Sequence, residues 1–224
     1  MTARKVLAVF LLGILSVVAI GVAGGASAAT KDYPPNQQPM YGGIEKTPAM
    51  KAADEAYIKS VLAAGYTRAG ASKEASKLGF QYLEKEDAAT AMKRFNQAWL
   101  LDPTNGDCYH GFALVLLGRD GDVRGGEAMF RKALSYPSAL AGANADYGRF
   151  LILMLRYPEV VRVLEAGVAK DQSYAGVRAL YAVALYHAGD FAKACSEVRR
   201  VRGEAFNEEL TQWVRTVAGS KECR

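Results

Sequence analysis

The two histidines are the first residues to consider for chemistry, because imidazole titrates near neutral pH and often binds metals. His110 and His187 fall in separate helical segments, and they form no His-x-x-x-His pair. An isolated histidine is more typical of a polar surface residue or a hydrogen-bonded core residue than of a catalyst. The sequence therefore predicts no metal site.

Other catalytic patterns are also missing from the sequence. The carboxylate pairs Glu84/Glu86 and Glu208/Glu209 fall on helix ends or solvated faces. No Gly-x-Ser-x-Gly motif, phosphate loop or dinucleotide fingerprint is present. The Gly-rich stretch 118–126 follows no strand, so a long turn is the better interpretation. We therefore predict a protein that is not an enzyme and needs no cofactor.

The three cysteines bear on the compartment of the protein. Cys195 and Cys223 fall in the last two predicted helical segments and are the better pair for a disulfide, which would leave Cys108 free. The alternative is three reduced, buried thiols. No Cys-x-x-Cys motif supports a redox role or a zinc ribbon.

The N-terminus is typical of an export signal. Arg4 and Lys5 precede an uncharged apolar run, 6–25, and Ala26-Ser27-Ala28 fits a signal peptidase site. We expect a cleaved signal peptide over 1–28 and a periplasmic protein without a membrane span. The alternative is an uncleaved signal that anchors the protein in the inner membrane.

The charge of the chain argues against a nucleic-acid partner. Loss of the predicted signal peptide lowers the formal net charge from +5 to +3. The remaining basic residues are interleaved with acidic ones, and no basic block or aromatic-basic stripe appears.

Two segments separate the signal from the main pattern. Residues 29–46 are rich in Pro, Gln and Gly, which predicts a flexible linker. Thr47-Pro48 then favours a helix start, and apolar residues at helical spacing predict a leading helix over 48–64.

From about residue 71, three classes of position recur at intervals of 34 or 35 residues. They are a small residue (Gly79, Ala113, Gly148, Ala182), a large apolar residue (Phe95, Phe130, Leu164, Val198) and a third position beginning with Ala98 and Ala133. This period is typical of a two-helix solenoid unit, in which small residues let helices approach and large ones fill the space between them.

At these residues the chain resembles the tetratricopeptide repeat family. The first copy shows Leu78-Gly79, Tyr82, Ala91, Phe95, Ala98 and Asp102-Pro103, and the fourth shows Tyr181-Ala182, Leu185 and Gly189-Asp190-Phe191. The resemblance implies an all-α, right-handed solenoid of about four helix pairs within a helical domain over 47–218. The predicted units are 71–105, 106–138, 139–172 and 173–203, followed by a capping helix over 204–218 and a tail over 219–224.

The resemblance also implies a binding mode. In this family the first helices of the units line a concave groove that holds peptides. Carried over by register, the groove candidates are Ser76, Phe80, Leu83, Asp107, His110, Leu114, Arg149, Ile152, Val183 and Tyr186. Packing against a neighbouring helix is the alternative role for the apolar members.

We therefore expect a scaffold that binds a protein or peptide partner. The alternatives are a carrier for a small molecule or glycan, or an accessory subunit of an enzyme complex in the cell envelope. The partner and the oligomeric state do not follow from the sequence.

Overall fold

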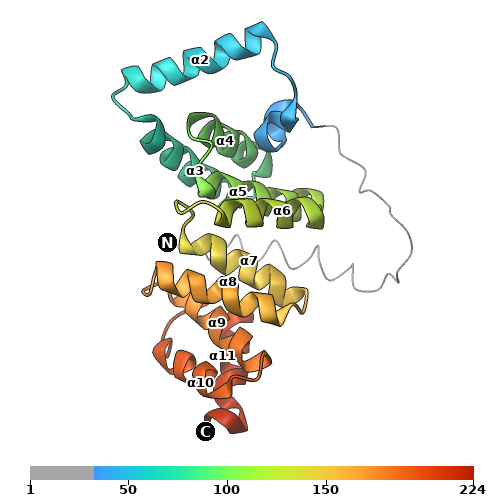
Figure 1. Ribbon diagram of the computed structural model, residues 1–224, viewed down its shortest axis with the longest axis vertical. Coiled ribbons are helices and arrows are strands. Elements are labelled where there is room, and N and C mark those ends of the chain that lie inside the picture. The colour runs from blue at the N-terminus through green and yellow to red at the C-terminus, as the bar shows by residue number, and fades with distance from the viewer. Residues whose placement is uncertain (1–32) are drawn as a thin grey trace, which may run out of the picture. The chain divides into compact units, whose positions relative to one another are not determined.

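The computed structural model describes residues 33–224, which contain ten α-helices and no strand (Figure 1). The predicted signal peptide and the start of the predicted linker lie outside the described residues. The chain divides after Ser138 into two compact units. This boundary coincides with the one predicted between the second and third repeats.

Unit 1 contains a short N-terminal segment, a leading helix and two helix pairs. Its elements are the turns η1 (Pro35–Gln37) and η2 (Pro39–Gly43), then α2 (Pro48–Ala63), α3 (Arg68–Glu84), α4 (Ala88–Leu101), α5 (Gly106–Val115), η3 (Leu116–Asp120) and α6 (Val123–Leu134). Helix α3 packs against α4, and α5 packs against α6.

Unit 2 contains two further pairs and a final helix. Its elements are α7 (Ala141–Leu153), α8 (Tyr157–Lys170), α9 (Ala175–His187), α10 (Phe191–Arg200), α11 (Glu208–Gly219) and the short turn η4 (Lys221–Cys223). Helix α7 packs against α8, and α9 packs against α10. The predicted all-α arrangement of paired helices is confirmed.

Helix capping explains where most second helices of the pairs begin. Asp87, Asp122 and Asp190 precede α4, α6 and α10, and each carboxylate accepts a hydrogen bond from a backbone N–H in the first turn. The hydrogen bonds from Thr90 hold the pKa of Asp87 below its usual value. Helix α8 follows Arg156, which makes no such cap, but Pro158 in its first turn favours a helix start.

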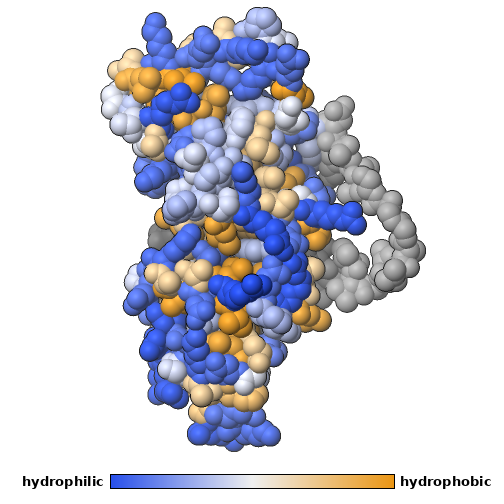
Figure 2. Space-filling view, in the orientation of Figure 1, coloured by the Kyte–Doolittle hydropathy of each residue, from blue (hydrophilic) through white to orange (hydrophobic). Residues whose placement is uncertain are grey.

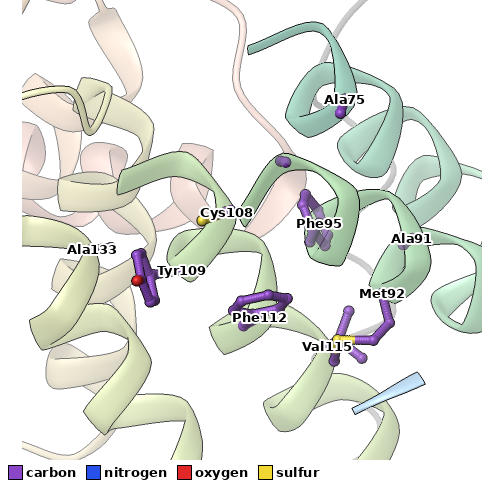
Figure 3. Packing of buried hydrophobic residues seen from close by; sticks show 10 residues of the cluster. Ala75, Ala91, Met92, Phe95, Cys108, Tyr109, Phe112, Val115 and Ala133 are labelled. Carbon is purple, nitrogen blue, oxygen red and sulfur yellow. The ribbon is translucent and has the colours of Figure 1, made fainter. Parts of the chain in front are cut away.

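The repeated positions form the cores of the units. The ten residues named above at the three repeated positions are all buried. A Cβ atom on Gly79 would lie 2.4 Å from the Phe95 ring, and one on Gly148 would lie 2.3 Å from Leu164. In both pairs a missing side chain makes room for the large residue of the second helix. Figure 3 shows Phe95 between the helices of unit 1, next to Phe112 of α5.

Part of the predicted linker is packed against the fold, because the turns η1 and η2 lie against α4. The side chain of Asn96, which is fully buried in α4, donates hydrogen bonds to the carbonyls of Asn36 (3.0 Å) and Gln38 (2.8 Å). It also accepts one from the backbone N–H of Tyr41 (3.2 Å). The sequence missed this contact because the partners are 55 to 60 residues apart.

The cysteines form one disulfide and one buried thiol. Cys195 of α10 and Cys223 of the C-terminal tail are joined, which closes a loop that contains α11. Cys108 is free and buried in unit 1, and its thiol donates a hydrogen bond to the Asn105 carbonyl. Burial raises the pKa of the Cys108 thiol well above its usual value.

Cys108 is therefore expected to be inert in the folded protein, because the thiolate is the reactive form and reagents cannot reach it. A maleimide at pH 8 should label no cysteine in the native protein and one in the denatured, unreduced protein, as counted by intact mass. Denaturation with a reductant should raise the count to three. Labelling of the native chain would contradict the burial of Cys108, and three labels without reductant would contradict the disulfide.

Candidate peptide-binding surfaces

The predicted groove residues fall on the first helices of the pairs, as expected. In unit 1 they lie on α3 and α5, which pack against each other, and in unit 2 on α7 and α9, which also do so. We call these surfaces the α3–α5 face (Ser76, Phe80, Leu83, Asp107, His110 and Leu114) and the α7–α9 face (Arg149, Ile152, Val183 and Tyr186). Each is described within its own unit.

Most polar candidates on the α3–α5 face take part in the fold instead of lining an open groove. The hydroxyl of Ser76 accepts a hydrogen bond from the side-chain NH₂ group of Asn105 at 3.1 Å. The side-chain oxygen of Asn105 accepts a hydrogen bond from the backbone N–H of Asp107 and so caps the start of α5. Asp107 and Leu114 are buried. His110 is buried as well, with its ring centroid 5.0 Å from that of Phe80. These four residues are therefore part of the packed interior of unit 1.

Two apolar residues of the α3–α5 face remain partly accessible. Phe80 and Leu83 are half-buried and pack against the core cluster of unit 1. The Phe80 ring meets Phe95 edge-on, with centroids 5.1 Å apart. These contacts hold Phe80 in one orientation, so part of an anchored aromatic side chain is open at the end of α3.

The last helix of the chain contacts the α7–α9 face at Arg149 and packs along α9. Helix α11 packs against α9 and α10, and its Glu209 accepts a hydrogen bond from the Arg149 guanidinium of α7. Arg149, Ile152 and Val183 are buried, and Tyr186 is half-buried. Arg149, Ile152 and Val183 therefore belong to the packed interior of unit 2, and α11 packs against both helices of the last pair.

Unit 1 also has a small apolar cleft between α2, α3 and α4. It measures about 170 Å³, and its lining includes Tyr57, Val61, Ala75 and Leu78 beside Arg94. Hydrophobic residues gather near the end of α2 on the visible surface (Figure 2). No residue of α2 is fully buried. The cleft was not predicted, because apolar residues on a leading helix normally indicate packing.

The remaining candidate residues for chemistry are the histidines and carboxylates. Between residues 33 and 224, no group of three or more His, Cys, Asp and Glu side chains could hold a metal ion. His187 is exposed and stacks on Tyr157, with ring centroids 4.8 Å apart. No helix of this part of the chain is long and apolar enough to cross a bilayer.

Comparison with solved structures identifies the class of fold. The chain is similar to PilF of Pseudomonas aeruginosa, with a TM-score of 0.56 and 21% sequence identity over 68% of this chain and 70% of that chain. It is also similar to YrrB, described as a TPR protein with an unusual peptide-binding site, with a TM-score of 0.51 and 18% identity over 67% of this chain and 77% of that one. The sequence matches no protein-family model and no curated protein. The paired helices and this likeness show that the chain has the tetratricopeptide-repeat fold.

Proposed function

We propose that the protein is a non-enzymatic scaffold that binds a protein or peptide partner through the α3–α5 face of unit 1. The observation that carries this proposal is that Phe80 and Leu83 are half-buried and pack against the core cluster of unit 1. The Phe80 ring also contacts the ring of Phe95. A rigid, partly exposed aromatic residue can bury apolar surface on binding with little loss of conformational entropy.

The fold supports this proposal without identifying the partner. YrrB, which shares the fold, is described as having a peptide-binding site. The α7–α9 face of unit 2 is a weaker candidate, because Arg149, Ile152 and Val183 are buried there.

The cleft beside α2 gives little support to the alternative of a small-molecule carrier. Its volume of about 170 Å³ is below the roughly 300–1,000 Å³ that is usual for ligand pockets. Residues 33–224 also show no group of metal-binding side chains that would favour an accessory role in one particular reaction.

Site-specific crosslinking tests the proposed surface. A photoreactive phenylalanine analogue placed at position 80 should crosslink a defined partner in the cells that make the protein. Met129 is the matched control position, because it is also half-buried and packs against the same core cluster, but from α6. The proposal fails if position 80 gives no adduct, or the same adducts as position 129, while circular dichroism shows both variants folded.

We further propose that the protein is exported to the periplasm and that its signal peptide is cleaved between Ala28 and Ala29. The uncharged run 6–25 and the Ala-Ser-Ala sequence support cleavage, and the Cys195–Cys223 disulfide fits an oxidising compartment. N-terminal sequencing of the protein from its natural host should begin at Ala29. An intact Met1 in the membrane fraction would instead support the anchored form.

A further inference from the structure

The cleft between α2, α3 and α4 of unit 1 has apolar walls and a rim that is open to solvent. Tyr57, Val61, Ala75 and Leu78 contribute to its lining. Leu78 is exposed although it is a large apolar side chain, and so is Tyr66, which follows α2 and also lines the cleft. Apolar side chains gathered on the surface in this way mark interaction sites (Figure 2).

Arg94 of α4 lines the same cleft, and one edge of its guanidinium is unpaired. Its Nη1 group donates a hydrogen bond to the side-chain oxygen of Gln97 at 2.9 Å. Its Nε is buried and has no acceptor among residues 33–224, and its Nη2 group makes no hydrogen bond within this part of the chain. Nε and Nη2 together are the two parallel donors that can hold one carboxylate.

A second arginine of unit 1 shows how this edge is used when it serves the fold. Arg68 of α3 donates from Nε to the Leu101 carbonyl and from Nη2 to the Leu100 carbonyl, both at 2.9 Å. Both donors therefore bind free carbonyls at the end of α4. The corresponding edge of Arg94 has no such structural role.

The residues around Arg94 do not neutralise its charge. The Tyr82 ring centroid lies 5.9 Å from the guanidinium carbon. Burial raises the pKa of Tyr57, and the positive charge of Arg94 opposes this rise, so the Tyr57 phenol is neutral near pH 7. Glu74 also lines the cleft, but its side chain is largely exposed and lies 3.9 Å from Lys77. The cleft therefore combines apolar walls with a cation that its lining does not pair.

We infer that this cleft is a docking site for an acidic, apolar segment of a protein partner. The segment inserts one large apolar side chain between α2 and α3 and places a carboxylate against the Nε–Nη2 edge of Arg94. A cleft of about 170 Å³ is too small for a whole ligand, but one anchoring side chain is the usual unit of an interface hot spot. Because the cleft is small, the carboxylate belongs to a residue next to the apolar one. This inference goes beyond the proposed function, which concerns the α3–α5 face.

Helix α2 can adjust to such a partner. None of its residues is fully buried. It is joined to α3 through residues 64–67, where Gly65 has a left-handed backbone (φ 86°). Elements with few buried contacts open at a low cost in free energy. A small outward shift of α2 would uncover the Nε of Arg94 and widen the cleft for the incoming side chain.

Three tripeptides, acetylated at the N-terminus and amidated at the C-terminus, test the inference on the whole protein. Glu-Leu-Glu carries the apolar side chain with a carboxylate on either side, Gln-Leu-Gln lacks the carboxylates, and Glu-Ala-Glu lacks the large side chain. Binding is followed by NMR through the methyl groups of Val61 and Leu78. We expect saturable shifts with Glu-Leu-Glu at a dissociation constant of about 1 mM. Either other peptide should bind about tenfold more weakly or worse.

Variant proteins separate the role of Arg94 from general charge attraction. In Arg94→Gln the preference for Glu-Leu-Glu over Gln-Leu-Gln should fall to within about twofold. Arg124→Gln is the matched control, because Arg124 is an exposed arginine of the same unit that does not line the cleft, and it should keep the preference. Glu74→Gln should keep or raise the affinity for Glu-Leu-Glu, because it removes a like charge from the lining. If Arg94→Gln does not fold, the comparison of the peptides on the wild type is still decisive.

Several results would overturn the inference. They are no saturable shift of the cleft methyl groups at about 10 mM Glu-Leu-Glu, equal affinity of Glu-Leu-Glu and Gln-Leu-Gln, and equal losses of preference in Arg94→Gln and Arg124→Gln. A weaker affinity in Glu74→Gln would show that the cleft selects a cation instead. Shifts confined to the Leu83 methyl groups would place the peptide on the α3–α5 face, which would support the proposed function and contradict this second site.

Discussion

Replacing Phe95 with alanine is expected to lower the free energy of unfolding of unit 1 by about 3–5 kcal/mol, the range for removing a fully buried aromatic side chain. Phe95 has no exposed surface, and its ring lies near Phe80, Phe112 and the backbones of Gly79 and Gly111. The cavity would adjoin two helix pairs at once, so we expect poor relaxation around it.

Urea titration followed by tryptophan fluorescence can measure this change in unit 1 alone. The chain has two tryptophans, Trp99 in α4 and Trp213 in α11, so a Trp213→Phe background isolates the signal of unit 1. Tyr66→Ala is the matched control, because this aromatic residue also belongs to unit 1 but is 56% exposed, and it should cost less than about 1 kcal/mol. A loss below about 1 kcal/mol for Phe95→Ala would contradict its central role in the core.

Replacing Asn96 with alanine is expected to release residues 33–43 from α4. The side chain of Asn96 makes three hydrogen bonds to the backbone of this segment. The loss of a buried hydrogen bond lowers stability by about 1–3 kcal/mol. Met40 and Tyr41 adopt left-handed backbone conformations with φ of 52° and 59°. Such residues are strained, so the docked turn depends on contacts with α4.

Limited digestion with chymotrypsin reports this release, because Tyr41 is protected while the segment is docked. We expect rapid cleavage after Tyr41 in Asn96→Ala, with the far-UV circular dichroism retained. Asn36→Ala is the matched control, because only the backbone carbonyl of Asn36 contacts Asn96 and its side chain is not needed. Equal protection of Tyr41 in the wild type and Asn96→Ala would show that Asn96 does not hold the segment.

The ionisation of Tyr41 gives an independent measure of the same contact. Burial raises its pKa to about 12, whereas an exposed tyrosine titrates near 10. Its contribution to docking is therefore complete below about pH 10 and is lost as the pH rises through about 12. In Asn96→Ala, absorbance titration should show one tyrosine shifted down toward 10.

The repeat positions and the helix limits follow largely from local sequence. The predicted leading helix, 48–64, agrees with α2 to within one residue at its end. The repeat interval relates Gly79 to Gly148 and Phe95 to Leu164. In unit 1 Gly79 lies against Phe95, and in unit 2 Gly148 lies against Leu164 in the same way. Such features are predictable because capping and helical periodicity depend on residues within a few turns of each other.

The surfaces that are available for binding were decided by tertiary structure. Sequence register placed Arg149 and Val183 on the correct helices, but it could not show that both are buried or that Arg149 donates to Glu209 of α11. The composition of residues 33–46 indicated a tether, whereas the buried amide of Asn96 holds this segment against α4. Both outcomes depend on pairs of residues about 60 positions apart. Local propensity contains no information on such pairs, because their energy comes from burial and hydrogen bonding that exist only after the chain has folded.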